Sequence, residues 1–261
     1  MKKYLSFAAY ALLASAMTFS LSACGGDDDD DNGNNGNETN NGGQTEKPLT
    51  PEGAAAVAVD LGLPSGTKWA AYNVGATKPE DYGSYFAWGE TAPKSNYSWS
   101  TYKWGTVEGK LTKYCNKSMD GKDGYTDTAN PEIGKVLTEL LPEDDAASVN
   151  WGGDWRMPTK EQIEELIAYT YNAWESGYNG TTVSGRKFTN KNDASKFIFL
   201  PAAGDRYGAS SYDVGSNGHY WSSSQEESGT TSAYDINFSV GHVSQDYNSR
   251  VFGRPVRPVK K

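Results

Sequence analysis

Short apolar runs separated by polar turns predict a fold made largely of short strands. Val57–Leu61 alternates and enters the turn-rich segment Gly62–Gly66, and Thr67–Ala70 is expected to return as a second strand. Later runs of the same kind are Phe197–Leu200, Tyr220–Ser224, Ser232–Ser239 paired with Gly241–Ser244, and Arg254–Val259. The prolines of the last run confine it to a sheet edge or to positions that donate no hydrogen bond.

Two stretches instead have helical spacing. Asn130 precedes a proline at the first helical position, and Pro142 ends the predicted helix. Its apolar positions are Ile133, Val136, Leu137, Leu140 and Leu141. A second helix begins at Thr159, which forms a capping box with Gln162. Its expected apolar face is Ile163, Leu166, Ile167 and Tyr171, and its glutamates are expected to face solvent.

The first residues of the chain have the pattern of an export signal. Lys2 and Lys3 precede the nearly uncharged stretch Leu5–Leu21, which is at the short end for a membrane span. The next residues complete Leu21-Ser22-Ala23-Cys24, which resembles the lipobox of bacterial lipoproteins. The resemblance implies a signal peptide over residues 1–23 and acyl chains on Cys24, and more than one chain gives lasting membrane attachment.

An acidic run, Asp27–Asp31, follows the cysteine and resembles the export tag of surface lipoproteins of Bacteroidota. A plain solvated spacer or a weak calcium-binding tail are the alternatives. Residues 24–52 contain almost nothing apolar and are expected to form a disordered tether that spans about 30 Å. The predicted location is therefore the outer membrane, with the domain of residues 53–261 exposed on the cell surface.

Composition narrows the partners of that domain. The formal net charge of the chain is −9, and clustered Lys and Arg are lacking, so we expect no nucleic-acid partner. Apart from Cys24 the chain has one cysteine, Cys115, which therefore has no intramolecular disulfide partner and is expected to be a small buried residue.

Several segments together resemble the Fibrobacter succinogenes major paralogous domain. They are VDLGLPSGTKWAAYNVGA (59–76), EDYGSYFAWGE (80–90), DDAASVNWGGDWRMPTKEQIEEL (144–166), HYWSSS (219–224) and FGRPVRPV (252–259). The resemblance implies an α+β, C-type lectin-like fold: two helices flank small mixed or antiparallel sheets with long loops. It also implies that the two ends of the domain meet in one sheet and that binding loops cluster at one end.

Neither a metal site nor catalysis is expected. The usual calcium triplets of the lectin group are absent, and Glu143–Asp145 either ligates calcium or caps the segment leading to Trp151. The formylglycine-generating enzymes, which share this fold, need a cysteine pair that Cys115 alone does not supply. His219 and His242 lie among polar residues and are expected to be exposed. We therefore expect no enzyme activity and no cofactor.

The late part of the domain has the composition of a binding surface, because tyrosine supplies contact area and Ser, Asn and Asp supply hydrogen bonds. The candidate ligand-binding residues are Arg206, Tyr207, Tyr212, Asp213, Asn217, His219, Tyr247 and Asn248. The expected partner is an extracellular glycan or protein. Alternatives are an assembly subunit of a surface appendage and, because Tyr220–Val259 resembles their variable end, a ligand-binding protein of a diversity-generating retroelement. A formylglycine-type enzyme is the remaining alternative.

The lipid anchor gives a first test. Cys24→Ala removes the acylated thiol, so the variant should leave the membrane fraction for the soluble fraction on cell fractionation. The unaltered protein should stay with membranes, and protease added to intact cells should digest its domain. A Cys24→Ala form that still partitions with membranes contradicts the anchor.

Overall fold

The computed structural model describes residues 57–108, 110–114, 137–227 and 231–261. The predicted leader, Cys24, the tether and Cys115 lie outside these residues. Among the residues described, no helix has the length and apolar character needed to cross a membrane.

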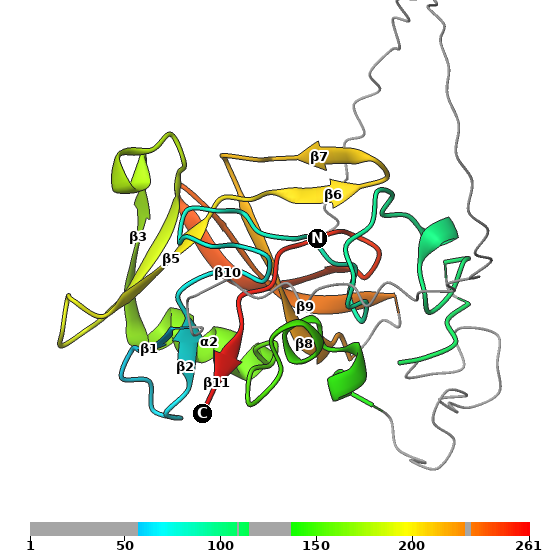
Figure 1. Cartoon of the computed structure of the whole chain (residues 1–261), viewed down its shortest axis with the longest axis horizontal. Helices are drawn as coiled ribbons and strands as arrows, with labels where there is room; N and C mark the ends of the chain where they lie inside the picture. Colours follow the sequence, from blue (N-terminus) through cyan, green and yellow to red (C-terminus); the bar gives the residue numbers. More distant parts are fainter. Residues whose placement is uncertain (1–56, 109, 115–136, 228–230) are drawn as a thin grey trace, which may run out of the picture. The chain divides into compact units, whose positions relative to one another are not determined.

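The described chain is α+β and rich in small antiparallel sheets (Figure 1). Its α-helices are α1 (Ala146–Trp151) and α2 (Lys160–Tyr169), and short 3-10 turns occur at Trp99–Thr101, Pro142–Asp144 and Tyr178–Gly180. One sheet has the order β1 (Ala58–Asp60), β2 (Lys68–Ala70), β11 (Val259–Lys260), and a second has the order β3 (Thr170–Glu175), β4 (Gly185–Asn190), β5 (Phe197–Pro201). A third has the order β10 (His242–Ser249), β9 (Ser232–Ser239), β8 (Gly218–Gln225), and β6 (Asp205–Tyr207) pairs with β7 (Ser210–Tyr212).

Helix α2 confirms the capping box read from the sequence. The Thr159 hydroxyl accepts a hydrogen bond from the Gln162 amide at 3.3 Å, and the Gln162 side chain accepts one from the Thr159 amide at 3.0 Å. Ile163 and Leu166 are buried as expected. Tyr171 was wrongly assigned to this face: the helix ends at Tyr169, and Tyr171 projects from β3 with 65% of its surface exposed.

The helix predicted to end at Leu141 is wrong in its described part. Residues 137–141 are extended, because the backbone of β8 offers them hydrogen bonds. The amide of Leu140 donates to the Ser223 carbonyl at 3.0 Å, and Glu139 forms a bridge with Ser224. Helix α1 begins after Asp145, whose carboxylate caps it by accepting from the Ser148 amide at 2.9 Å. The capping alternative for the acids before Trp151 is thus confirmed for Asp145.

The first two strands are confirmed, and the ends of the described domain share their sheet. Val259 of β11 lies opposite Trp69 of β2, and Figure 1 shows these strands side by side. The closing strand is shorter than expected: Val259–Lys260 alone is a strand, whereas Arg254 makes a single bridge with Phe86. Prolines at 255 and 258 supply no amide donor, which explains the shortening.

The β8–β9–β10 sheet has two differently covered faces because side chains alternate along each strand. On one face, Tyr220, Ile236 and Phe238 pack in one core cluster with residues of α2. On the other face, Trp221 and Ala233 belong to a second cluster. The register aligns Tyr220 with Ile236 and Trp221 with Asp235, so each strand contributes to both faces.

The cap of α2 provides a stability test. Thr159→Ala removes the hydroxyl acceptor and should lower the free energy of unfolding by about 1 kcal/mol, measured by urea denaturation. Thr159→Ser keeps the hydroxyl and should stay close to the unaltered protein. Thr182→Ala, at an exposed position outside the helix, is the control. Equal losses at Thr159→Ala and Thr182→Ala would contradict the capping role.

Candidate functional site

The β6–β7 hairpin is fixed to the domain through its backbone. Arg206 and Gly253 exchange two hydrogen bonds of 2.8 and 2.9 Å, and Gly208 and Tyr97 exchange two of 2.8 Å. Gly204, just before the hairpin, has φ +60°, and a Cβ there would lie 2.0 Å from the Tyr212 carbonyl oxygen. The side chains of the hairpin are therefore presented on a constrained backbone.

The two faces of the hairpin divide the candidate residues. The register pairs Asp205 with Tyr212, and alternation places Asp205, Tyr207 and Tyr212 on one face. The Tyr207 ring meets the Phe252 ring edge to face at 5.3 Å between centroids. Arg206 projects from the opposite face, where its guanidinium lies 5.4 Å from the centroid of the Tyr97 ring. Arg206 is therefore separated from the two tyrosines.

A buried arginine joins the hairpin to the large sheet. The Arg254 guanidinium lies 3.2 Å from the Asp205 carboxylate and forms a second ion pair with Asp235 of β9. It also lies over the Trp221 ring at 4.6 Å. Burial lowers the pKa of Arg254 to about 10, and the Asp205 carboxylate opposes this shift. Burial also raises the pKa of Asp205, against the lowering effect of Arg254.

Around this arginine, the sheet presents a surface that we call the polar face. It consists of the β8–β10 side chains on the side away from α2, together with one face of the hairpin. Alternation and register assign to it His219, Asp235, Asn237, His242, Ser244, Asp246 and Asn248 from the sheet, beside the buried Trp221 and Ala233, and Asp205, Tyr207 and Tyr212 from the hairpin. The Asn248 amide donates to the Asp235 carboxylate at 3.4 Å. Tyr207 and Tyr212 are half-exposed members of this face and Asn248 is partly exposed, whereas His219 lies buried beneath it.

His219 was expected to be exposed, and this is wrong. Its side chain is buried, with 8% of its surface accessible, because the strand turns it toward Arg254. Burial first, and then the charge of Arg254, lower its pKa from 6.5 to about 3. The imidazole is therefore neutral at physiological pH. His242 is exposed as expected, and its Nε2 lies 2.8 Å from the Ser244 hydroxyl.

The structure places Tyr247 away from the polar face. It neighbours Asn248 in sequence, so alternation turns it to the α2 side of the sheet. Its ring meets the Tyr234 ring edge to face at 6.2 Å, and the Lys160 amino group lies 4.9 Å from the centroid of Tyr234. Tyr247 is 53% exposed, but it belongs to a different surface.

Asp213 and Asn217 shape the loop that follows the hairpin. Asp213 has φ +56°, is exposed, and its carbonyl accepts from the amides of Ser216 and Asn217 at 3.0 and 2.9 Å. The Asn217 carbonyl accepts from the Gly204 amide at 2.7 Å. The carboxylate of Asp213 contributes to raising the pKa of Asp205. Asp213 therefore borders the polar face, whereas the backbone of Asn217 supports the loop.

The candidate residues did not include Asp235, Arg254 and Asn237, and they omitted Asp205 and Asp246 although both lie within the expected binding segment Asp205–Asn248. The period of two in Ser232–Ser239 held a usable signal, since Asp235 and Asn237 alternate with Ile236 and Phe238. It did not show that an arginine nineteen residues later would pair with Asp235, because that contact depends on how the chain returns.

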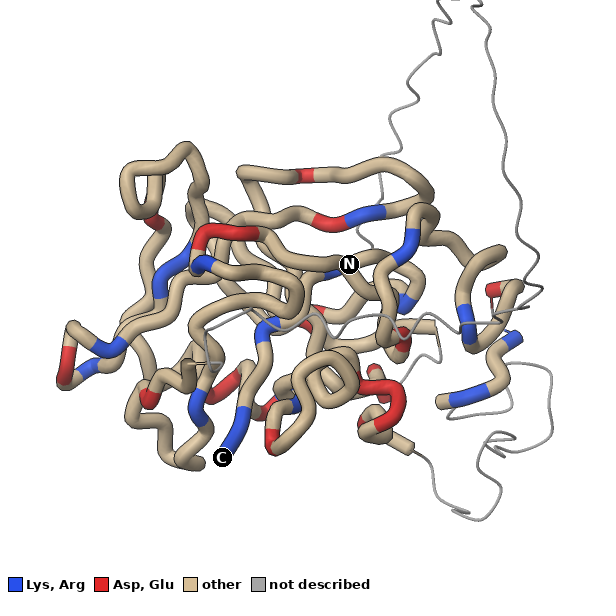
Figure 2. Tube along the Cα trace, viewed as in Figure 1, with Lys and Arg blue, Asp and Glu red and all other residues tan. Residues whose placement is uncertain are grey.

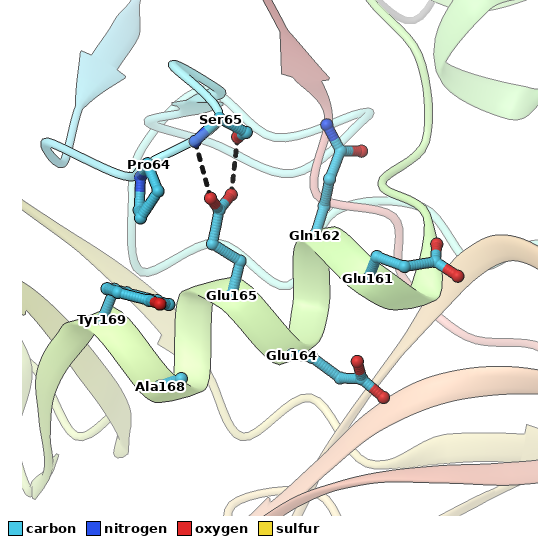
Figure 3. A pocket seen from close by; sticks show the side chains of 8 residues that line it. All are labelled: Pro64, Ser65, Glu161, Gln162, Glu164, Glu165, Ala168 and Tyr169. Atoms are coloured by element: carbon cyan, nitrogen blue, oxygen red, sulfur yellow. Dashed lines mark hydrogen bonds between the residues drawn. The ribbon is translucent and has the colours of Figure 1, made fainter.

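A groove elsewhere on the domain is less suited to binding chemistry. It has a volume of about 370 Å³ and lies between the first turn and α2 (Figure 3), lined by Pro64, Ser65, Glu161, Gln162, Glu164, Glu165, Ala168 and Tyr169. The Glu165 carboxylate accepts from the Ser65 amide and hydroxyl at 2.7 and 2.6 Å, so it holds the turn to the helix. Glu161 and Glu164 are exposed as expected, and Glu165 is half-buried.

The acids considered for calcium have protein partners. Asp144 is buried and accepts from Lys113 and Tyr114, each at 2.7 Å, while Asp145 caps α1. In the part of the chain that the structure describes, no group of three His, Cys, Asp or Glu residues is placed to hold a metal ion.

Comparison with known proteins identifies one family match. Residues 172–259 match the family described as Domain of unknown function (DUF8237). This segment contains the hairpin, the β8–β10 sheet and Arg254, and hence the whole polar face. No curated protein and no solved structure matches the chain.

The burial of His219 predicts a pH dependence of stability. Between its unfolded pKa of 6.5 and its folded pKa of about 3, the unfolded chain binds a proton that the folded chain does not. Stability therefore falls as pH drops through this window, by at most about 1.4 kcal/mol per pH unit from this group. His219→Gln should flatten the slope, measured by urea denaturation at several pH values.

His242→Gln is the matched control, since this histidine is exposed. It should keep the slope of the unaltered protein. Both variants keep Asp205, Asp235 and Arg254. Any contribution of these three residues to the slope of stability against pH is therefore the same in both variants. Identical slopes for the two variants would contradict the buried, neutral state of His219.

Proposed function

We propose that this chain is a lipid-anchored surface protein of the outer membrane whose domain binds an extracellular glycan or protein on the polar face. Cys24 is the proposed attachment site, and the proposed fold is C-type lectin-like. Support for that fold comes from the shared sheet of β1, β2 and β11, the two α-helices and the small antiparallel sheets. In this proposal the domain acts by binding and not by catalysis.

One observation carries the binding proposal: two half-exposed tyrosines stand on a buried, charged frame. Tyr207 and Tyr212 are 47% and 49% exposed, whereas Arg254 beneath them is 1% exposed and Asp235 is fully buried. Two tyrosine side chains that are already fixed in place lose little conformational entropy when a ligand binds. The ion pairs of Arg254 thus support a preformed contact surface.

The tyrosines give the test. Tyr207→Ala and Tyr212→Ala should each weaken binding about tenfold, the typical effect of removing an aromatic contact residue. Both rings are half-exposed, so the melting temperature should stay near that of the unaltered protein. Binding is measured by pull-down of surface-displayed full chain with extracts of glycans and proteins, and by titration of whatever is captured.

Tyr247→Ala is the matched control, because this tyrosine is equally exposed but faces α2. It should bind as the unaltered protein does. A large fall in melting temperature for Tyr207→Ala would identify a core residue instead of a contact residue. Concentration-dependent self-association without any captured ligand would favour the assembly alternative.

A further inference from the structure

Negative charges outnumber positive charges at the polar face. Around it the structure places four carboxylates, those of Asp205, Asp213, Asp235 and Asp246. A single guanidinium, Arg254, pairs with two of them, and Arg206 projects from the other side of the hairpin. Figure 2 shows an acidic position next to a basic one on β6 and a further acidic position directly after β7. Since His219 is neutral, the field at this face is negative.

Buried side-chain atoms beneath the face lack a hydrogen-bond partner in the described part of the protein. They include Oδ1 of the fully buried Asp235, Nδ1 of His219, whose residue is 8% exposed, and Nε of Arg254. Buried polar atoms are normally hydrogen-bonded, to protein, to ordered water or to a ligand. The carboxylate oxygen requires a donor, and the neutral imidazole takes a donor or an acceptor according to its tautomer. An enclosed water molecule satisfies both atoms.

We propose that the polar face binds an uncharged, hydroxyl-rich glycan and rejects anionic glycans. This inference rests on the proposed binding function and adds the class of ligand. Carboxylates accept hydrogen bonds from sugar hydroxyls, and the amides of Asn237 and Asn248 both donate and accept them. Tyr207 and Tyr212 supply flat apolar surface with a hydroxyl at the edge.

The charges also favour a glycan over a protein ligand. The central part of a protein–protein interface is depleted in charged residues and enriched in aromatic residues, Met and Arg. Here Asp246 lies exposed on the face, and the buried Asp235 and Arg254 lie beneath it. A sulfated or uronic acid polymer would bring more negative charge to this surface, and like charges across an interface are unfavourable.

The test compares neutral with anionic polysaccharides. Full chain displayed on cells is titrated with laminarin, mannan and xylan as neutral probes and with heparin and polygalacturonate as anionic probes, at about 0.15 M salt. At least one neutral probe should bind, at least about tenfold more tightly than either anionic probe. Its affinity should change little with salt, and Tyr207→Ala should weaken it about tenfold.

Charge reversal provides the second measurement. The double variant Asp213→Lys, Asp246→Lys should weaken the neutral probe about tenfold, because it loses acceptors, and should gain heparin binding. Both side chains are exposed, but Asp213 has φ +56°, so a melting curve must show that the double variant keeps its fold before the affinities are compared. The control is the double variant Glu161→Lys, Glu164→Lys, which makes the same change in net charge at exposed positions of α2, on the opposite side of the sheet. It should leave the affinities for the neutral probe and for heparin unchanged.

The outcomes separate this inference from the proposed function. Heparin binding by the unaltered chain that is lost in Tyr207→Ala overturns the neutral class and leaves the binding face intact. A protein captured through Tyr207 with no polysaccharide bound overturns the glycan class in the same way. Neutral glycan binding that survives Tyr207→Ala and the charge reversal overturns both proposals.

Discussion

The arrangement of this domain depends on the ion pairs of one buried arginine. Arg254 connects Asp205 of the hairpin to Asp235 of the central strand β9, and it covers the Trp221 ring. Removing two carboxylates and a guanidinium from water is costly, and the cost is offset only when the charges meet in good geometry. Such a contact contributes little net stability but disfavours other positions of the hairpin, since each would leave a buried charge unpaired.

Arg254 is one of three arginines that the last part of the chain buries. Arg257 donates to the Asn73 side chain at 2.7 Å and to the Phe199 carbonyl at 2.9 Å, and Arg250 donates to the Tyr114 carbonyl at 2.7 Å. The guanidinium has five donors in a fixed planar arrangement, so it can satisfy several carbonyls of irregular segments at once. These side chains hold together loops that have few ladder hydrogen bonds of their own.

The proposed binding face follows from this frame. One side of the sheet packs with α2, and the other carries the buried charges together with Trp221 and Ala233 of the second core cluster. Ion pairs form the base of this face, and its exposed residues are Tyr, Asn, Asp and Ser. Such side chains suit a ligand that makes many directional hydrogen bonds. Tyr247 illustrates how strict the division is, since it lies one residue from Asn248 and on the opposite side of the sheet.

The sequence alone determined the elements whose cause is local. Helix α2 was predicted because Thr159 and Gln162 cap it through their own side chains. Alternation predicted β9, and its partner was expected over Gly241–Ser244, whereas β10 continues to Ser249. Tertiary structure decided the rest. Residues 137–141 have helical spacing, yet they are extended because the β8 backbone supplies hydrogen bonds from eighty residues away. His219 is buried, and Asp235 is paired, because the chain returns with Arg254 beside them, and no local pattern encodes the path of that return.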